Sequence, residues 1–221
     1  MGKEKKVFNL IHKSTKRNYL KRMLNNKFHF MKIAKKYDKN YWDGSRDSGY
    51  GGYKYIEGYW DRVINKLIKY YNLNNNSKVL DVGCGKGFLL HDLKKKFPNI
   101  QIHGLEISNY AINKSPKLIR NKIKNIKAQS KYPFKNKYFD LAISFGCIHN
   151  LEIYDLKKCL YEITRVSKKQ FIMTESYRNN KELFNLQCWA LTCESFFSPK
   201  EWKWIFKLFD YSGDYEFIYF E

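Results

Sequence analysis

The sequence of 221 residues has no long hydrophobic run. A membrane-spanning helix needs about 20 consecutive apolar residues, and the N-terminal "MGKEKKVFNL" has only a short apolar patch behind its lysines. That patch does not support a secretory signal, and Lys6 stands where a myristoylation signal requires Ser or Thr. We therefore predict a cytoplasmic protein without stable membrane insertion.

Cysteine is also sparse. The five cysteines are odd in number and are never spaced as C-x-x-C, which argues against a disulfide framework and against a zinc site. No other cluster with metal-ligand spacing is visible, so we expect no metal. The cysteines are Cys84, Cys147, Cys159, Cys188 and Cys193.

Arginine is rare although the formal net charge is +21. Residues 1–40 hold 13 basic and two acidic residues, a net +11, and residues 113–137 hold nine basic and no acidic residues. Only seven of the 42 basic residues are arginine, the preferred residue for forked contacts to phosphates and bases. A solvated basic surface is therefore the favoured interpretation, and an RNA-binding surface stays open as the alternative.

The chain divides into three expected parts. Residues 1–40 form a basic extension with helical patterns, and residues 41–60 form a segment rich in glycine and tyrosine. Residues 61–221 form one domain, in which strand and helix patterns alternate from residue 78 onward. This alternation predicts an α/β fold that is Rossmann-like and doubly wound, with a mostly parallel sheet and helices on both faces.

The end of the chain carries a different signal. "SPKEWKWIFKLF" predicts a helix with Ser198 as its N-cap and Pro199 at its first position. Ser212 and Gly213 then favour the turn of a short hairpin. We therefore expect an antiparallel strand at the C-terminus.

The most informative stretch is "VLDVGCGKGFLL", residues 79–90. An apolar strand runs into Gly83, Gly85 and Gly87 and then into a helix whose free amide groups face the turn. Glycine lets a ligand lie against the backbone. Asp81 precedes the first glycine by two residues, where its carboxylate would repel a pyrophosphate and attract a cation. The stretch therefore predicts a site for a ligand that carries an ammonium group.

Residues 61–176 resemble the class I S-adenosylmethionine-dependent methyltransferases. "DVGCGKG" matches their E/D-x-G-x-G-x-G cofactor loop, and "HGLEIS" places Glu106 where the family binds the ribose hydroxyls, with Ile107 next to pack on the adenine. "YPFKNKYFDLAISFGCIHNL" is similar to the family's fourth-strand region. The resemblance implies S-adenosyl-L-methionine as the cofactor and S-adenosyl-L-homocysteine as its product.

The sequence departs from the family pattern at the third-strand loop. Where the family usually has a Gly-Asp pair that reaches the adenine amine, this chain has Lys127 and Ala128. Gln129, Ser130 or a main-chain carbonyl could replace that contact. The cofactor-binding residues expected from the resemblance are Asp81, Gly83, Cys84, Gly85, Gly87, Glu106, Ile107, Gln129 and Ser144.

Methyl transfer to an oxygen requires a closely held acceptor and a nearby base. His149, just past the fourth strand, is the leading candidate base because neutral imidazole accepts a proton near pH 7; the alternative is a helix-cap or pocket-wall histidine. Glu175 and Tyr177 follow a strand at the edge where open α/β sheets bind ligands, and they are candidate catalytic contacts to the acceptor. A salt bridge to Arg178 or a lysine is an equal alternative.

The stretch "GYGGYKYIEGYW", residues 49–60, has neither helical nor strand periodicity. We interpret it as a lid in which glycines act as hinges, while aromatic rings cover the sulfonium and exclude water. An aromatic loop packed on the core is the alternative. The lid candidates are Tyr50, Tyr53, Tyr55 and Trp60.

These features favour an enzyme that O-methylates a small or glycan-linked metabolite. RNA methylation, with residues 1–40 and 113–137 along the phosphates, is the alternative. The N/D-P-P-Y/F tetrapeptide of many base-amine methyltransferases is absent after the fourth strand, which disfavours adenine N6 as the acceptor. A third hypothesis is a basic binding protein with a vestigial cofactor fold, and the intact Asp81 and Glu106 argue against it.

Overall fold

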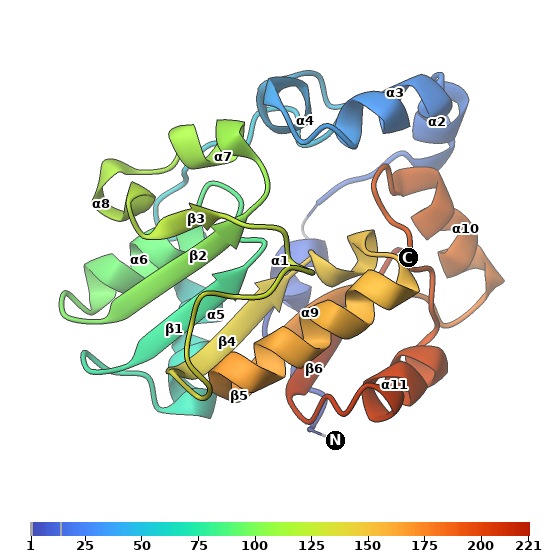
Figure 1. Ribbon diagram of the computed structural model, residues 1–221. Helices are drawn as coiled ribbons and strands as arrows, with labels where there is room; N and C mark the ends of the chain where they lie inside the picture. The colour runs from blue at the N-terminus through green and yellow to red at the C-terminus, as the bar shows by residue number, and fades with distance from the viewer. Residues whose placement is uncertain (1, 14) are drawn as a thin grey trace.

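The computed structural model describes residues 2–13 and 15–221. At its centre lies a six-stranded sheet in the order β3-β2-β1-β4-β5-β6, with all neighbouring strands parallel (Figure 1). The strand order reverses between β1 and β4, as in doubly wound folds, which confirms the predicted Rossmann-like architecture. The strands are β1 (Lys78–Val82), β2 (Gln101–Glu106), β3 (Ile123–Asn125), β4 (Phe139–Phe145), β5 (Ser167–Ser176) and β6 (Asp214–Tyr219).

Helices cover both faces of this sheet (Figure 1). One face packs against α5 (Asp61–Tyr71) and α6 (Phe88–Lys96), and the other packs against α9 (Ile153–Val166) and α11 (Pro199–Leu208). The remaining helices are α1 (Asn9–Lys13), α2 (Tyr19–Leu24), α3 (Lys27–Ala34), α4 (Lys39–Asp43), α7 (Asn109–Asn113), α8 (Lys117–Arg120), η1 (Ile148–Asn150) and α10 (Asn180–Trp189).

The core has one apolar layer on each face of the sheet. Val63 and Leu67 lie one helical turn apart on α5 and are fully buried on the first face. Leu156 and Leu160 have the same spacing on α9 and are fully buried on the second. Because helices cover both faces, most residues of the strands are buried, although β2 and β5 also contain polar residues.

The expected antiparallel C-terminal strand is wrong. β6 pairs in parallel with β5, in the register Phe171↔Asp214 to Ser176↔Tyr219. The predicted turn at Ser212 is preceded by helix α11 rather than by a strand, so no hairpin partner is available. A chain that returns to a sheet through helices can enter it in the parallel direction. The predicted start of α11 is confirmed, with Ser198 in a capping box.

The first residues of the chain contact the sheet edge. Glu4 forms a parallel bridge with Tyr215, and the buried carboxylate of Glu216 accepts hydrogen bonds from the backbone N–H groups of Val7 (2.8 Å) and Asn9 (2.9 Å). The division of the chain at residues 40 and 60 stays a prediction.

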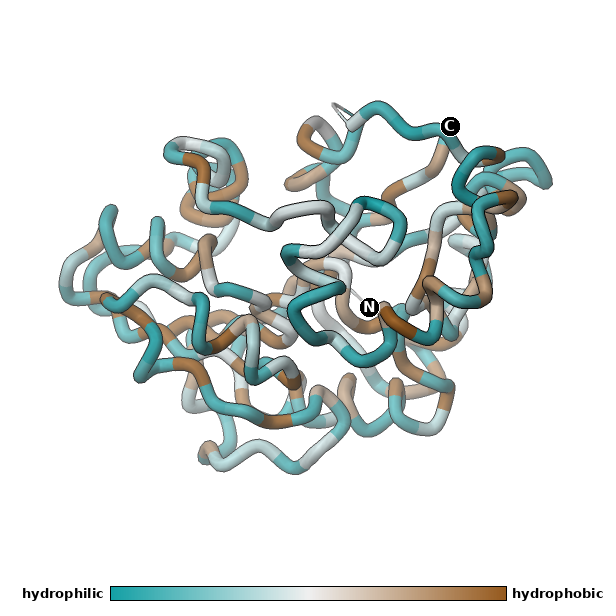
Figure 2. The backbone as a smooth tube through the Cα atoms, turned by 90° about the horizontal axis from the view of Figure 1, so that it is seen from above, coloured by the Kyte–Doolittle hydropathy of each residue, from teal (hydrophilic) through white to brown (hydrophobic). Residues whose placement is uncertain are grey.

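Helices α2, α3 and α4 lie above the side of the sheet where the parallel strands end (Figure 1). Seen from that direction, hydrophobic stretches of the backbone are short and alternate with hydrophilic ones (Figure 2). Within residues 2–13 and 15–221, no helix combines the length and the apolar character needed to cross a membrane.

Candidate active site at the carboxyl ends of the strands

The predicted glycine loop joins β1 to α6 in a conformation that requires glycine. Gly83, Gly85 and Gly87 have φ values of 76°, 57° and 71°, all in the left-handed region. A Cβ atom on Gly85 would lie only 2.8 Å from the ring of Trp42. The loop is therefore shaped for close approach, and in this structure an aromatic ring of α4 lies against it.

Asp81 is a buried carboxylate that lacks a hydrogen-bond partner at one oxygen. Its side chain points out of β1, the residue is 4% exposed, and Oδ1 contacts no donor within the described chain. Burial, together with the nearby charge of Glu106, raises the pKa of Asp81 from 3.8 to about 8. Burying an unpaired carboxylate costs free energy, and a cationic ligand would offset that cost.

Glu106 has the partners that Asp81 lacks. Its Oε2 accepts a hydrogen bond from the N–H of Gly85 (2.8 Å), and its Oε1 accepts one from the N–H of Ser108 (2.8 Å). Burial raises the pKa of Glu106, while these hydrogen bonds oppose the rise. Two anchored oxygens at the end of β2 keep lone pairs that can accept further hydrogen bonds from hydroxyl groups.

Ile107, the residue after Glu106, follows the end of β2. Ile107 is a large apolar side chain with 45% exposure, and its carbonyl accepts a hydrogen bond from Nδ2 of Asn125 (2.7 Å). The residues present fit S-adenosylmethionine: Asp81 would bind the ammonium, Glu106 the ribose hydroxyls and Ile107 the adenine.

The other predicted cofactor residues point elsewhere. Ser144 Oγ is buried and donates to the carbonyl of Val82 (2.9 Å), and Gln129 Nε2 donates to Asp155 at the start of α9 (3.1 Å). The thiol of Cys84 fills the space beside Gly104, where a Cβ atom would lie 2.6 Å from Sγ. The structure does not bring the side chains of Ser144 or Gln129 to the Asp81 and Glu106 pair, so their cofactor contacts stay predictions.

Two of the four predicted lid residues lie over the glycine loop. The ring of Tyr50 stacks on Trp42 (5.2 Å between centroids), and the ring of Tyr53 stacks on Phe88 at the start of α6 (5.1 Å). Nε1 of Trp42 donates to Ser108 Oγ (3.0 Å), which fixes the ring between the loop and the end of β2.

The other two lid candidates attach the segment to the body of the protein. Tyr55 donates a hydrogen bond to Asp92 of α6 (2.6 Å). Trp60 is buried and packs against Phe8 and Phe145. These contacts match the alternative of an aromatic loop packed on the core, while the movement of a lid stays a prediction.

A buried lysine of the glycine loop ties it to the segment above. Lys86 is 4% exposed, and its Nζ lies 2.7 Å from both carboxylate oxygens of Asp43 and 2.7 Å from the carbonyl of Tyr53. Asp43 also accepts a hydrogen bond from the hydroxyl of Tyr110 (2.8 Å). Although burial opposes it, the hydrogen bonds from Lys86 and Tyr110 lower the pKa of Asp43.

The candidate base His149 and the candidate acceptor contact Glu175 come together. Nε2 of His149 lies 3.5 Å from Oε2 of Glu175. His149 is 5% exposed, and its buried Nδ1 has no partner within the described chain. Burial lowers the pKa of His149, while the charge of Glu175 opposes this. The carboxylate beside Nε2 favours a proton there, which leaves Nδ1 as the basic nitrogen.

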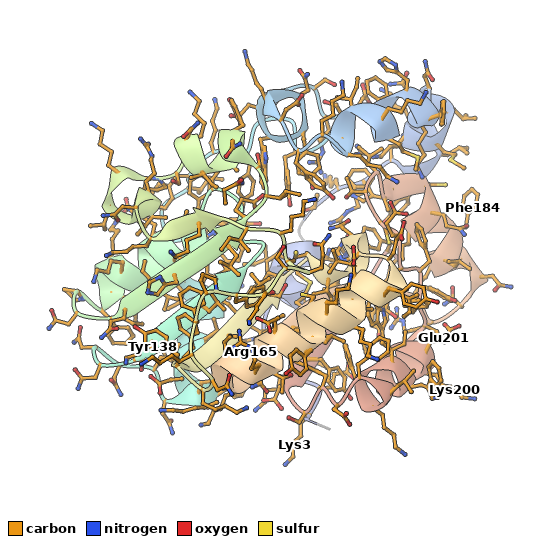
Figure 3. The ribbon with its side chains drawn as sticks, viewed as in Figure 1. Lys3, Tyr138, Arg165, Phe184, Lys200 and Glu201 are labelled. Carbon is orange, nitrogen blue, oxygen red and sulfur yellow. The ribbon has the colours of Figure 1, made fainter. Side chains whose placement is uncertain are left out.

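Tyr177 does not join this pair. Its hydroxyl lies 3.5 Å from Oε2 of Glu201, a residue of α11 that Figure 3 labels, so the catalytic role of Tyr177 stays a prediction. Tyr50 is 41% exposed, but partial desolvation and the charges of Glu175 and Glu106 raise the pKa of its hydroxyl to about 12, although a hydrogen bond with Tyr41 opposes the rise. The hydroxyl of Tyr50 therefore lies within electrostatic reach of both carboxylates.

Sequence analysis missed several residues of this site. Trp42 and Asp43 stand in "YWDG", just before the segment singled out as a lid, and their aromatic and acidic character was the available signal. Lys86 lies inside the glycine loop, and nothing in the sequence indicated its partner. Within residues 2–13 and 15–221, no three His, Cys, Asp or Glu side chains gather as a metal ion would require.

The chain matches a known family model. A model described as a methyltransferase domain matches residues 73–210. The crystal structure of geranyl diphosphate C-methyltransferase from Streptomyces coelicolor A3(2), in complex with Mg²⁺, geranyl diphosphate and S-adenosyl-L-homocysteine, is similar with a TM-score of 0.50. The identity is 12%, and the match covers 69% of this chain and 64% of that chain, so this likeness shows the fold.

Two curated proteins are similar over part of the chain. The ribosomal RNA small subunit methyltransferase C of Buchnera aphidicola subsp. Cinara cedri is 37% identical over 108 residues, 48% of this chain and 30% of that protein. The tRNA (guanine-N(7)-)-methyltransferase of Mycoplasma capricolum subsp. capricolum is 39% identical over 80 residues, 33% of this chain and 36% of that protein. The chain matches about a third of the length of each relative.

Proposed function

The chain belongs to the methyltransferase-domain family and is a class I S-adenosylmethionine-dependent methyltransferase, and from this premise we propose that it methylates an oxygen atom of a small or glycan-linked acceptor. The observation that carries the proposal is the pair formed by His149 and Glu175. A buried imidazole with an unpartnered nitrogen is suited to take the proton of an acceptor hydroxyl.

The cofactor half of the site recognises a cation next to a ribose. Asp81 attracts the ammonium group, and Glu106 accepts hydrogen bonds from the ribose hydroxyls while Gly85 and Ser108 hold its carboxylate in place. S-adenosylmethionine, when bound, supplies a methyl group on a sulfonium, from which the carbon–sulfur electron pair returns to sulfur as the acceptor oxygen bonds to the methyl carbon.

The acceptor half controls one proton. His149 is neutral at physiological pH because burial lowers its pKa. Glu175 keeps the ring proton at Nε2, so that Nδ1 accepts the proton of the hydroxyl as the oxygen is methylated. After transfer, the carboxylate of Glu175 stabilises the positive charge on the ring.

The enclosure of the site favours a small acceptor. Asp81 and His149 are both buried, and the rings of Trp42 and Tyr50 lie above the glycine loop. An enclosed site of this kind suits a small molecule, or the end of a glycan, because such an acceptor can be surrounded by the protein.

The test compares the wild type with His149→Gln. Protein, labelled S-adenosylmethionine and a low-molecular-weight extract of the source organism are incubated together, and labelled product is counted. We expect the variant to transfer methyl at least about 100-fold more slowly, while its affinity for S-adenosyl-L-homocysteine, measured by calorimetry, stays within about twofold. Equal rates would remove His149 as the base.

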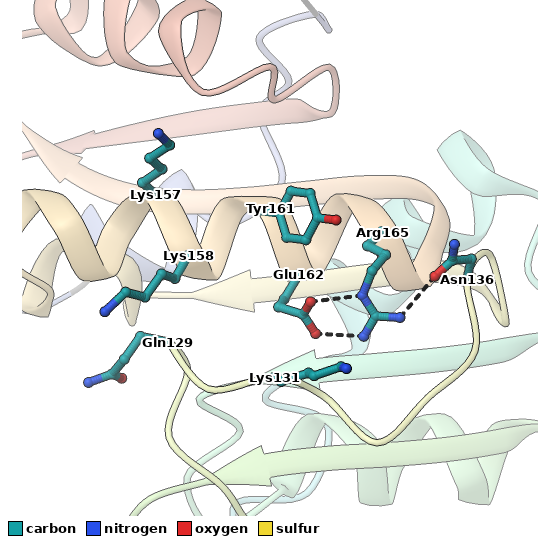
Figure 4. A pocket seen from close by; sticks show the side chains of 8 residues that line it. All are labelled: Gln129, Lys131, Asn136, Lys157, Lys158, Tyr161, Glu162 and Arg165. Atoms are coloured by element: carbon teal, nitrogen blue, oxygen red, sulfur yellow. Dashed lines mark hydrogen bonds and ion pairs between the residues drawn. The ribbon is translucent and has the colours of Figure 1, made fainter.

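RNA methylation is the second candidate, and a basic pocket favours it. The pocket, of about 750 Å³, lies between α9 and the segment before β4 (Figure 4). Lys157 and Lys158 line it from α9 beside Tyr161, an exposed aromatic ring on which a base could stack, and Lys131 lines it from the opposite segment. Both curated relatives are RNA methyltransferases by name.

A double substitution separates this candidate from the first. If RNA is the acceptor, Lys157→Ala with Lys158→Ala should weaken RNA binding and reduce its salt dependence by about two charges. Lys69→Ala with Lys200→Ala removes the same charge elsewhere and serves as the control. RNA binding that is equal in both double variants would argue against this surface.

A further inference from the structure

Three of the seven arginines of the chain meet at one tryptophan ring. The guanidinium carbons of Arg22, Arg46 and Arg17 lie 4.4, 5.0 and 5.5 Å from the ring centre of Trp189, the last residue of α10. They come from α2, from the turn after α4 and from the chain before α2. Figure 1 shows α2 beside α10, on the side where the strands end.

Their hydrogen-bond partners are neutral. Arg22 donates from Nε to the carbonyl of Trp189 (2.9 Å) and from Nη1 to the carbonyl of Arg46 (2.7 Å). Arg46 donates from Nη1 to the carbonyl of Tyr50 (2.8 Å). Arg17 donates to the carbonyl of His12 (3.1 Å), and its buried Nε has no partner within the described chain.

Two of the other four arginines of the chain have carboxylate partners. Arg165 pairs with Glu162, and Arg178 pairs with Glu182 and Glu221. Within residues 2–13 and 15–221, no ion pair within 4.0 Å includes Arg17, Arg22 or Arg46. Three cations that share one ring without an anion repel one another, which is costly unless a ligand supplies the negative charge.

The pKa values of these arginines agree with the lack of a negatively charged partner. Burial, together with the charge of Arg46, lowers the pKa of Arg22 to about 10. Burial also lowers the pKa of Arg17. The acids that act on these groups, Asp47 on Arg22 and Glu175 on Arg17, lie beyond ion-pair distance.

The cluster lies next to the acceptor half of the site. Arg46 binds the backbone of Tyr50, whose ring stacks on Trp42 above the glycine loop. Arg17 lies within electrostatic reach of Glu175, the partner of His149. A group bound among the arginines would therefore lie on the side of the site that holds Glu175 and His149.

We propose that Arg17, Arg22 and Arg46, gathered around Trp189, bind an anionic group of the methyl acceptor, a carboxylate or a phosphate. This inference rests on the proposed function and narrows its acceptor to a small anionic molecule. The planar forks of arginine match the oxygens of both groups, and Trp189 keeps the forks in place. The three residues position the acceptor and take no part in the proton transfer.

The test titrates anions onto protein that is already saturated with S-adenosyl-L-homocysteine. Sodium phosphate and sodium acetate are titrated separately by calorimetry, at one ionic strength set with chloride. We expect the wild type to bind at least one of them saturably, and the tighter of the two identifies the acceptor group. Arg22→Ala should bind that anion at least about tenfold more weakly, and Arg22→Lys should show an intermediate loss because it keeps the charge without the fork.

Arg62→Ala, an exposed arginine of α5, removes the same charge and should leave anion binding unchanged. Arg22→Lys also guards against an alanine variant that fails to fold. Equal anion binding in the wild type and both Arg22 variants, or no saturable binding by the wild type, would overturn the inference. Failure of the wild type to bind S-adenosyl-L-homocysteine would instead contradict the cofactor site of the proposed function.

Discussion

The cofactor half of the site comes from residues 81–107, one strand, turn, helix and strand, whereas the acceptor half gathers side chains that lie between residues 17 and 189. In the first half, Asp81 and Glu106 end neighbouring strands and need only the parallel sheet to meet. In the second, His149 lies in η1 just after β4 and Glu175 lies near the end of the neighbouring β5, but the arginines come from in and around the N-terminal helices. In the proposed site, a local motif would bind the cofactor, whereas segments that are distant in the sequence would bind the acceptor.

The largest expected effect is a loss of cofactor affinity, caused by a substitution in the cofactor half alone. Asp81→Asn removes the carboxylate that would bind the ammonium, so affinity for S-adenosyl-L-homocysteine should fall by about 100-fold or more, as when a buried ion pair loses one partner. In the wild type the affinity should rise with pH up to about 8, since Asp81 ionises there. Calorimetry between pH 6 and 8 tests both statements.

The same substitution should also change how the stability of the protein depends on pH. The pKa of Asp81 is about 8 in the folded protein and 3.8 ordinarily. Ionisation of Asp81 therefore destabilises the ligand-free fold. This loss of stability is absent below pH 3.8, grows as the pH rises and is complete above about pH 8. Asp81→Asn should therefore raise the free energy of unfolding by about 1–3 kcal/mol at pH 8 and leave it nearly unchanged at pH 4. Urea unfolding measures this, and a loss of stability at pH 8 would contradict the orphaned carboxylate.

The next largest effect is a change in the pH dependence of activity, caused by a substitution in the acceptor half alone. Activity should fall at low pH because His149 takes up a proton there. The midpoint of this fall should lie below pH 6.5, the ordinary pKa of histidine, because burial lowers the pKa of His149. Glu175 raises that pKa, so Glu175→Gln should move the acid limb of kcat/KM to lower pH and reduce the plateau several-fold. A limb that moves to higher pH, or does not move, would show that His149 and Glu175 do not act together.

The smallest expected effect is on stability and concerns the contact between Trp42 and the glycine loop. Gly85→Ala would place a Cβ atom 2.8 Å from Trp42 at a φ of 57°, whereas Gly52→Ala, at a φ of 99°, meets no atom within 4 Å. Both variants strain the backbone, so Gly85→Ala should lower the free energy of unfolding by about 1–2 kcal/mol more than Gly52→Ala. Adding Trp42→Leu should recover part of that difference in a double-mutant cycle, and no recovery would mean that Trp42 does not press on the loop.

The parts of the fold and site that the sequence predicted are those with local causes. Alternating strand and helix patterns led to the parallel sheet, and the resemblance of the stretch from Asp81 to Glu106 to a known family led to the predicted cofactor residues. The sheet then brings these residues together because their strands are neighbours. The closeness of His149 and Glu175 has a similar cause, because His149 follows β4, Glu175 lies near the end of β5, and these strands are neighbours.

The parts that the sequence did not predict depend on long-range contacts or on side-chain direction. Lys86 binds Asp43, 43 residues away, and no local pattern connects them. Ser144 was placed correctly at the end of β4, but its side chain turns toward Val82. Tyr177 follows the last residue of β5, where the alternation of a strand no longer fixes the direction of a side chain. The antiparallel C-terminal strand was predicted from Ser212 and Gly213 alone, without knowledge of the strand with which β6 pairs.

The most direct test of the account follows the methyl group itself. Labelled S-adenosylmethionine is incubated with an extract of the source organism and with wild-type or Asp81→Ala protein, and the label is partitioned between anionic small molecules, neutral small molecules and RNA. The account predicts label among the anionic small molecules, present with the wild type and absent with the variant. Label that enters RNA instead, with the same dependence on Asp81, would contradict a small acceptor and make the lysines beside α9 the binding surface.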